Sequence, residues 1–164
     1  MALTFLLLGS NLGNKCKNLC TAEYELSLRA GILIKKSSVY QSPPWGFEHN
    51  EDFLNQVLKF ETQQSPNHLL DTILQIEQEM GRKRSNGTKT YLPRLIDIDI
   101  LFYDDLIHKS EKLILPHPNL HLRRFTLEPL SEIAPDFFHH VLKRTIKELL
   151  EICPDHSMTK KLIH

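Results

Sequence analysis

The segment that most constrains the fold is a short apolar run that contains two aspartates, Asp97 and Asp99. Its other residues are mostly isoleucine and leucine, a composition typical of a strand. Side chains alternate between the two faces of a strand, so the pattern predicts one face, directed at the core, made of Ile96, Ile98, Ile100 and Phe102. The opposite face then carries both carboxylates. The chain is therefore expected to form a sheet with one buried face and one acidic face.

Two carboxylates two residues apart on a strand lie roughly 6.5–7 Å apart along it and can bind the same small hard cations, of which Mg²⁺ fits best. The alternative is a pair of aspartates that only faces solvent. The preceding segment favours a site, because residues 81–94 contain five basic residues and no acidic one. Cations beside a metal-binding carboxylate pair are typical of polyphosphate chemistry. Taken alone, this basic segment could equally be a solvated loop.

Length and charge limit the remaining possibilities. The 164 residues suit one domain, which we expect to span residues 1–164. Twenty basic and twenty acidic residues leave no overall field for nucleic acid or membrane surfaces. The apolar residues 2–8 lack a basic leader and a cleavage pattern, so they read as a buried strand. An odd number of cysteines without zinc spacing indicates a reducing compartment and a cytoplasmic protein. Cys16 and Cys20 are expected to be small packing residues.

Periodicity and breaker residues predict the order of elements. Strand patterns cover residues 3–8, 32–40, 53–62 and 94–102, and helical patterns cover residues 15–28 and a segment that begins at Ser65-Pro66 and ends at Gly81. The order is β-α-β-β-α-β, which predicts an α+β, ferredoxin-like core: an antiparallel sheet with helices packed on one face and the other face open to a ligand. Later segments look like C-terminal additions around this core.

Several motifs carry a more specific signal. In order along the chain they are Gly9-Ser10-Asn11-Leu12-Gly13, Ser42-Pro43-Pro44-Trp45-Gly46, Phe53-Leu54-Asn55, Gly81-Arg82-x-Arg84, Pro93-Arg94-x-x-Asp97-Ile98-Asp99-Ile100, and Pro116-His117 followed by Arg123-x-Phe125. With this order and spacing the chain closely resembles the 6-hydroxymethyl-7,8-dihydropterin pyrophosphokinase (HPPK) family over about residues 3–152. The resemblance implies transfer of pyrophosphate from ATP to the pterin hydroxymethyl group, with release of AMP, in folate biosynthesis.

The resemblance also implies a pterin site. Phe53 and Phe125 would stack on the two sides of the ring and Asn55 would hydrogen-bond its edge, which suits a flat and poorly charged ligand. Without the resemblance, core packing would be the simpler role for both phenylalanines. Further pterin contacts are expected from Ser42, Pro43, Pro44, Trp45 and Tyr91.

On the nucleotide side, the resemblance assigns two Mg²⁺ ions to Asp97 and Asp99. Arg82 and Arg94 are the candidate cationic donors to the phosphates, with Lys89 assisting. The expected ATP contacts are Glu77, Arg84, Arg94, Ile100, His117 and Arg123. Glu77 could alternatively be a helix-surface carboxylate paired with an arginine. Apart from His117, the histidines fit no standard metal site and are expected in exposed loops.

The chain departs from the family pattern at Leu74, Leu92 and Pro118. These departures leave open which residues contact ATP. Two other classes of function remain open. A ferredoxin-like sheet with exposed aromatic residues also suits RNA binding, although two aspartates would repel phosphates in the absence of metal. A nucleotide-binding regulatory domain without catalysis is the second. ATP and the pterin are the expected partners, without nucleic acid or membrane, and a monomer is the simplest assembly.

Overall fold

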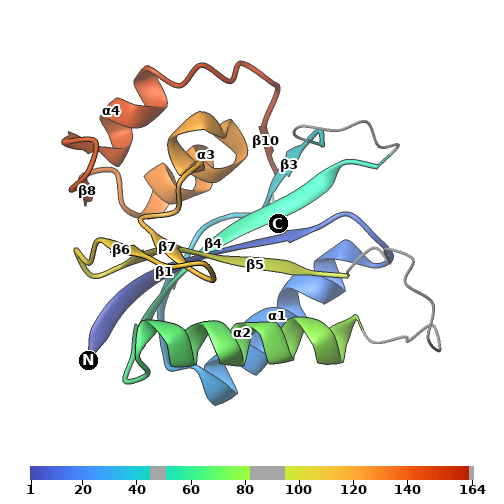
Figure 1. The fold of residues 1–164 in the computed structure, drawn as a ribbon. Helices are drawn as coiled ribbons and strands as arrows, with labels where there is room; N and C mark the ends of the chain where they lie inside the picture. The colour runs from blue at the N-terminus through green and yellow to red at the C-terminus, as the bar shows by residue number, and fades with distance from the viewer. Residues whose placement is uncertain (45–50, 82–94, 163–164) are drawn as a thin grey trace.

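The computed structural model describes residues 1–44, 51–81 and 95–162 of the chain. Its elements, shown in Figure 1, are β1 (Ala2–Ser10), α1 (Lys15–Arg29), β2 (Ile32–Lys36), β3 (Tyr40–Ser42), β4 (Phe53–Thr62), α2 (Pro66–Met80), β5 (Asp97–Tyr103), β6 (His108–Lys109), β7 (Ile114–Leu115), the 3₁₀ helix Leu120–Leu122, α3 (Arg124–Ile133), β8 (Phe138–His139), β9 (Arg144–Thr145), α4 (Ile146–Glu151) and β10 (Lys160–Lys161). None of the helices in these ranges has the length and apolar character needed to cross a bilayer.

The main sheet is antiparallel and has the order β10-β3-β4-β1-β5, with β2 also paired to β4. Strand β1 is an inner strand that pairs with β4 from Ala2↔Thr62 to Ser10↔Leu54 and with β5 from Thr4↔Tyr103 to Gly9↔Asp97. If β2 and β3 count as one interrupted strand, this is the predicted β-α-β-β-α-β core. The α+β, ferredoxin-like prediction is confirmed, and it leaves β5 as an end strand.

The strand predicted over residues 32–40 is interrupted between Lys36 and Tyr40. The hydrogen bonds of Ser37 explain the position of the break. Its backbone N–H donates to the Val57 carbonyl at 2.9 Å, and its hydroxyl oxygen accepts from the Val57 N–H at 2.9 Å. A side-chain oxygen thus replaces the main-chain acceptor that a regular ladder would use. Strand β2 therefore ends at Lys36, and β3 resumes at Tyr40 with Tyr40 opposite Asn55.

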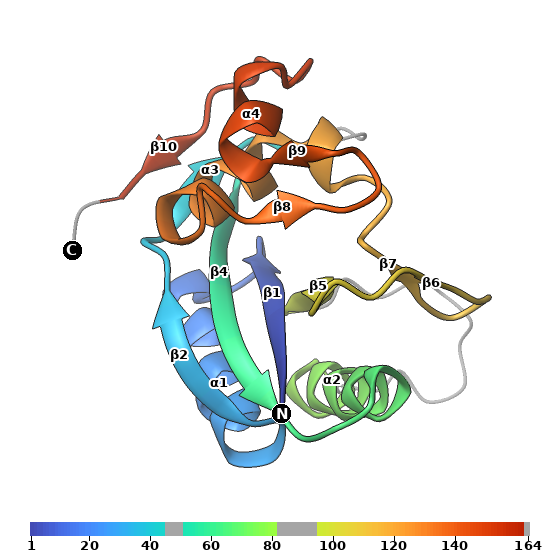
Figure 2. The same cartoon turned by 90° about the vertical axis from the view of Figure 1, so that its left-hand side faces the viewer.

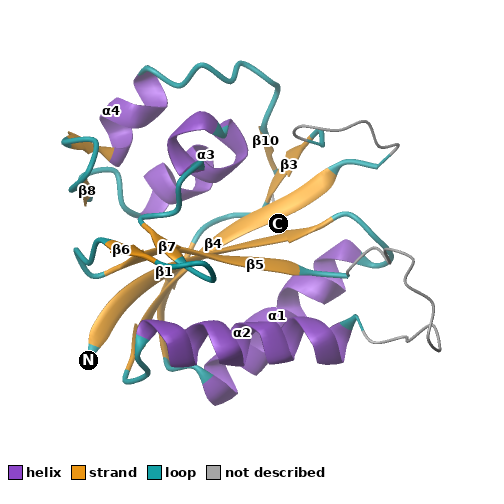
Figure 3. Cartoon of the chain, in the orientation of Figure 1, coloured by secondary structure: helices purple, strands orange, loops and turns teal. Residues whose placement is uncertain are grey.

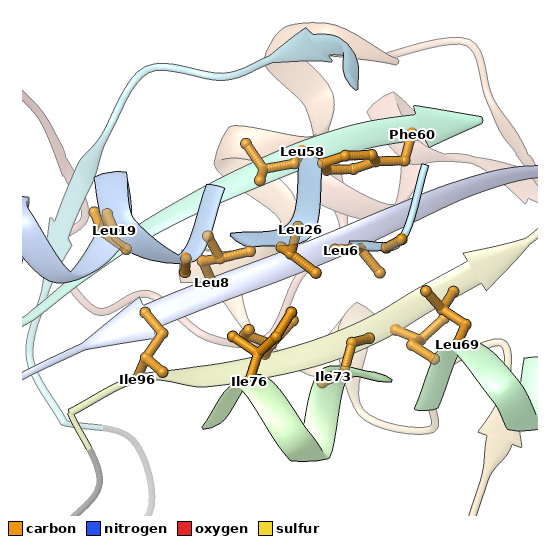
Figure 4. Packing of buried hydrophobic residues seen from close by; sticks show 14 of the residues in the cluster. Leu6, Leu8, Leu19, Leu26, Leu58, Phe60, Leu69, Ile73, Ile76 and Ile96 are labelled. Atoms are coloured by element: carbon orange, nitrogen blue, oxygen red, sulfur yellow. The ribbon is translucent and has the colours of Figure 1, made fainter. Parts of the chain in front are cut away.

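The first core lies between the sheet and the helix pair α1 and α2 (Figure 4). Helix α2 begins as predicted, with the Ser65 hydroxyl accepting the His68 N–H at 3.2 Å and Pro66 in the first helical position. Its inner stripe of Leu69, Ile73 and Ile76 is fully buried against β1 and β5, as Figure 4 shows. The predicted helix faces are therefore confirmed.

A second core covers part of the opposite face, which the sequence left open. Helices α3 and α4 lie on this face (Figures 1 and 2) and pack Leu127, Leu130 and Leu149 against Phe5 and Val57. The prediction of helices on one face alone was wrong, because the C-terminal additions supply a further layer (Figure 3). The open part of this face is confined to the end of the sheet where β1 finishes and β5 begins.

The predicted facing of Phe102 was also wrong. Phe5 pairs with Phe102 while the next residue, Leu6, pairs with Ile100, so Leu101 is an extra residue in β5. Such a bulge reverses the alternation of faces beyond it. Phe102 consequently packs in the second core, with its ring 4.7 Å from that of Phe137, while Ile98 and Ile100 stay in the first core.

The exposure of Cys16, Cys20 and His139 differs from the predictions made for them. Cys16 and Cys20 are exposed, so their predicted packing role was wrong, whereas Cys153 is buried in the second core. All three are free thiols. His139 was expected in an exposed loop but is only 4% exposed, because its ring packs edge-on against Phe102 at 5.4 Å.

Acid should destabilise the protein through His139. Burial, assisted by the nearby His121, lowers the pKa of His139 from 6.5 to about 4. A histidine whose folded pKa lies below its unfolded pKa stabilises the fold above pH 6.5, and this contribution is lost as pH falls towards 4. We expect a loss of about 2–3 kcal/mol from this residue across that window. Urea denaturation at pH 7 and pH 4.5 measures it.

The control for this prediction is His139→Gln, which removes the titrating group and should show a smaller difference in unfolding free energy between the two pH values. Other carboxylates and histidines titrate in both proteins and cancel in the comparison. Equal losses in the parent and in His139→Gln would contradict the assignment to His139.

Candidate active site

A cavity of about 380 Å³ opens at the end of the sheet, where β1, β4 and β5 meet α2 and the beginning of α3. This size suits a small-molecule ligand. The lining residues are Leu7, Gly9, Ser42, Pro43, Phe53, Asn55, Leu70, Leu74, Glu77, Asp97, Ile98, Asp99, Arg123 and Phe125. Most of the described residues that the sequence singled out therefore lie around one space.

Asp97 and Asp99 are the first and third residues of β5, the end strand of the sheet. Asp97 pairs with Gly9 of β1 and Asp99 pairs with Leu7 of β1. The two aspartates are two residues apart on one strand, so their side chains share one face of the sheet. Both line the cavity, and the Asp99 side chain is 42% exposed. Neither carboxylate is sealed in the apolar interior, which is what a cation-binding pair requires.

Glu77 supports this pair from helix α2. It is only 6% exposed, and its carboxylate accepts the backbone N–H of Ile98, the residue between the two aspartates, at 2.6 Å. Glu77 is therefore not at the helix surface, while its alternative pairing with an arginine of residues 82–94 lies outside the described residues. The bond fixes the outer edge of β5 to α2 at the level of the acidic pair.

The aromatic side of the cavity comes from two separate elements. Phe53 begins β4 and Asn55 follows two residues later on the same face, while Phe125 lies in the first turn of α3. The Asn55 amide donates to the Ser42 hydroxyl at 2.8 Å, and both side chains are buried. Two rings and an oriented amide thus converge on the space in front of the carboxylates.

Helix α3 is held at both ends, which fixes the position of Phe125. At the start, Asp155 accepts from the Arg124 N–H at 3.0 Å and the Arg124 Nε donates to the Asp155 carbonyl at 2.7 Å. Near the end, Glu132 accepts from the Tyr40 hydroxyl at 2.8 Å and from Ser38. These bonds also lower the pKa of Glu132 despite its partial burial, so the carboxylate remains charged.

Two further predicted residues lie near Asp99. Arg123 lines the cavity, and its guanidinium lies 5.7 Å from the centre of the Phe125 ring, a cation–π distance. His117 Nε2 lies 4.0 Å from Asp99 Oδ2. Burial lowers the pKa of His117, the charge of Asp99 opposes that shift and Arg123 reinforces it. The His117 Nδ1 accepts the Asn119 N–H at 3.2 Å, so in the neutral ring the Nε2 carries the proton and faces the acidic pair.

The structure does not bring every predicted residue into the cavity lining. His117 instead lines a neighbouring cavity of about 240 Å³ with Pro118 and His121. The Ile100 side chain is 4% exposed and packs in the first core, so only its main chain, on an end strand, could reach a nucleotide. Pro44 is described but does not line the cavity. The predictions for Trp45, Arg82, Arg84, Lys89, Tyr91, Leu92 and Arg94 lie outside the described residues.

Leu70 and Leu74 line the cavity but were not predicted to contact a ligand, whereas Glu77 on the same helix was an expected ATP contact. Leu70, Leu74 and Glu77 are spaced as one stripe of α2, at positions i, i+4 and i+7, and all three line the cavity. Helical spacing could have identified this stripe. Leu74, noted only as a departure from the family pattern, is 47% exposed there. Gly9 lies beside Asn55 because β1 pairs with β4 in this register. The sequence motif that contains Gly9 does not reveal this pairing.

Gly9→Ala should impair the aromatic side of the cavity, where Phe53 and Asn55 lie. A Cβ atom at this position would lie 3.2 Å from Asn55 Oδ1 and 3.7 Å from the Phe53 ring. Asn55 would have to shift by a few tenths of an ångström, and its bond to Ser42 would be strained. For the two substrates that the family resemblance implies, we expect a KM for the pterin about tenfold higher and a KM for ATP within twofold in steady-state assays. An unchanged pterin KM would show that the cavity tolerates the methyl group.

Comparisons with known proteins identify the family of the chain. The family model described as 7,8-dihydro-6-hydroxymethylpterin-pyrophosphokinase (HPPK) matches residues 5–135. The chain belongs to the HPPK family. An *Aquifex aeolicus* protein named 2-amino-4-hydroxy-6-hydroxymethyldihydropteridine pyrophosphokinase is 41% identical over 148 residues, which cover 90% of each chain. Membership favours pyrophosphate transfer over the RNA-binding alternative.

Other HPPK relatives are longer. The *Schizosaccharomyces pombe* protein named Folic acid synthesis protein fol1 is 38% identical over 159 residues, which are 95% of this chain but 21% of that protein. The chain thus spans about a fifth of that relative. Among solved structures, wild-type HPPK-DHPS of *Plasmodium falciparum* matches with a TM-score of 0.73 and 19% identity over 92% of this chain and 44% of that one. This likeness supports the fold.

Proposed function

We propose that this HPPK family member transfers the pyrophosphoryl group of ATP to the hydroxymethyl oxygen of 6-hydroxymethyl-7,8-dihydropterin and releases AMP. The observation that carries the proposal is that an acidic pair, two aromatic rings and an oriented amide line one cavity. Such a cavity has a place for a polyphosphate beside a place for a flat heterocycle. ATP and the pterin are accordingly the proposed partners.

The pterin would lie between Phe53 and Phe125. Stacking between two rings suits a planar ring system that has little charge. The Asn55 side chain, oriented by Ser42, would read the polar edge of the ring. The hydroxymethyl group would then point towards Asp97 and Asp99 across the cavity.

The donor set suits Mg²⁺. Carboxylate oxygens are the ligands that this hard cation prefers, and Mg²⁺ is usually held by one or two carboxylates together with substrate phosphates and water. Within the described ranges no group of three or more potential ligands converges, which fits such an open site better than a closed protein cage. We propose that Asp97 and Asp99 hold two Mg²⁺ ions, which supply charge neutralisation for the triphosphate.

The reaction forms a bond between the hydroxymethyl oxygen and the β-phosphorus. It breaks the bond from that phosphorus to the oxygen bridging the α-phosphorus, and AMP leaves with this oxygen. The hydroxyl proton passes to a carboxylate oxygen of Asp97 or to water. Arg123, which lines the cavity with the acidic pair, would bind phosphate oxygens, and we assign the same role to Arg82, Arg84 and Arg94. Glu77 and His117 are proposed as further contacts to ATP.

We further infer a monomer located in the cytoplasm. One chain already brings the acidic pair, the two aromatic rings and the oriented amide to one cavity, which suits a site built within a single subunit. Three free thiols suit a reducing compartment. Light scattering after gel filtration tests the assembly, and a dimer that dissociates with loss of activity would overturn it.

The nucleotide product tests the proposed function. The chain is incubated with ATP, Mg²⁺ and 6-hydroxymethyl-7,8-dihydropterin, and nucleotides are separated by ion exchange. We expect AMP that appears only when the pterin is present, in equal amount to the pterin diphosphate. ADP would indicate an ordinary kinase, and absence of any turnover would indicate a binding domain; either result would overturn the proposal.

A further inference from the structure

Asn18 is a buried amide that the proposed mechanism does not use. It lies on the first turn of α1 and is 9% exposed, next to the apolar inner residues Leu19 and Ala22. Its Nδ2 donates to the Leu95 carbonyl at 3.3 Å, to the Ser10 hydroxyl at 3.1 Å and to the Leu12 carbonyl at 2.9 Å. A leucine would fill this place without desolvating an amide, so packing alone does not account for an asparagine here.

Ser10 completes a small network on the same carbonyl. It is the last residue of β1, it is 1% exposed, and its hydroxyl donates to the Leu95 carbonyl at 2.7 Å. The Leu95 oxygen thus receives hydrogen bonds from two side chains on two elements. Such a doubly bonded carbonyl fixes the main chain at that point.

The position of Leu95 gives this network its consequence. The pairing between β1 and β5 ends at Gly9↔Asp97, so Asp97 is the last paired residue of an end strand and is the place where such a strand frays. Leu95 lies two residues before it. On the far side, Glu77 holds the Ile98 N–H. Asp97 therefore lies between two fixed points, one made by Ser10 and Asn18 and the other by Glu77.

We infer that Asn18, together with Ser10, is a positioning residue for Asp97: it holds the main chain before the end strand so that the carboxylate faces the cavity. This inference rests on the proposed function of Asp97. Functional groups need positions accurate to roughly half an ångström, and a displacement of about 1 Å can reduce a rate about 100-fold. Loss of the network should therefore affect the acidic side of the site before the pterin side.

The test compares Asn18→Leu, which removes both amide hydrogens at similar volume, and Ser10→Ala, which removes one hydroxyl, with the control Asn14→Ala. Asn14 caps the same helix through its Oδ1, which accepts the Lys17 N–H at 3.1 Å, whereas the Leu95 carbonyl is bonded by Ser10 and Asn18. The control thus weakens the start of α1 without touching the network. Ser10→Ala keeps the test available if Asn18→Leu does not fold.

The first readout is hydrogen exchange at the amides of Asp97, Ile98 and Asp99 in metal-free protein, measured by NMR. Asn18→Leu and Ser10→Ala should each exchange at least tenfold faster there, at unchanged exchange in β4, and Asn14→Ala should not. The second readout is kinetic. We expect kcat about 10- to 100-fold lower and a Mg²⁺ concentration for half-maximal rate about tenfold higher, with the pterin KM within twofold.

Because both side chains act on one carbonyl, the double variant should lose less than the product of the two single effects. Exchange and Mg²⁺ dependence that match Asn14→Ala would overturn the positioning role. If the parent chain makes no AMP from ATP and the pterin, the proposed function fails whatever the variants do. If the parent is active but Asn18→Leu and Ser10→Ala change neither the amide exchange at residues 97–99 nor the Mg²⁺ dependence of the rate, only the inference about Asn18 fails.

Discussion

Asp97→Asn should reduce kcat about 1000-fold while leaving pterin affinity within about twofold. The substitution keeps the size of the side chain but removes the charge that holds a divalent cation beside the triphosphate. Loss of metal-based charge stabilisation of several kcal/mol corresponds to three or more factors of ten in rate. The pterin side should be spared, because Phe53, Asn55 and Phe125 come from β4 and α3. Steady-state kinetics and pterin titration measure both quantities.

The matched control is Asp105→Asn, which makes the same chemical change at an exposed aspartate just beyond β5 and outside the cavity lining. It should keep the activity of the parent. Asp99→Asn should resemble Asp97→Asn if the two carboxylates act together. Small and equal losses of turnover and pterin affinity in Asp97→Asn would remove Asp97 from the metal-binding role.

Phe125→Ala should raise the pterin KM about 10- to 100-fold. An aromatic ring stacked on a heterocyclic base is worth about 1–3 kcal/mol, which corresponds to this range of affinity. Phe125 is half-buried at the cavity, and helix α3 is fixed independently by Asp155 and Glu132. The truncation should therefore leave the helix in place and the KM for ATP within threefold, as measured by steady-state kinetics.

Phe138→Ala is the control for this change. Phe138 is exposed on β8, so its truncation removes an aromatic ring of the same kind away from the cavity. Its pterin KM should equal that of the parent. If Phe125→Ala and Phe138→Ala give the same KM, or if Phe125→Ala weakens ATP as much as the pterin, the stacking role of Phe125 is wrong.

Local patterns were sufficient for much of the fold. The inner stripe of α2 and its Ser65 cap follow from helical spacing and capping chemistry, and β4 has the predicted bounds, Phe53–Thr62. The two aspartates share a face because two-residue alternation holds until the bulge at Leu101. These features depend on residues close together in the chain, which is why the sequence alone could identify them.

The features that were missed depend on long-range register. The bulge that turns Phe102 to the other core arises from pairing with Phe5, about a hundred residues earlier in the chain. The covering of the second face depends on where α3 docks, through Glu132 and Tyr40. The contacts of Asn18 with Leu95 join an early helix to the last core strand. No periodicity within one segment encodes such contacts.

In the candidate active site, too, local sequence predicts some features and contacts between distant residues decide others. Motif spacing selected Phe53, Asn55, Asp97 and Asp99, and the structure places all four around one cavity. Motif spacing did not separate Ile98 from Ile100, because alternation gives both residues the same face, whereas in the structure only Ile98 of the two lines the cavity. The basic residues Arg82, Arg84 and Arg94 stay predictions.

The most direct test of the proposed site is a crystal structure of the chain with Mg²⁺, the pterin and an ATP analogue in which a methylene group replaces the oxygen between the α- and β-phosphates. We expect cations at about 2.1 Å from carboxylate oxygens of both Asp97 and Asp99, with the pterin between Phe53 and Phe125 and its hydroxymethyl oxygen directed at the β-phosphorus. Cations bound away from these two carboxylates, or a pterin outside the two rings, would contradict it.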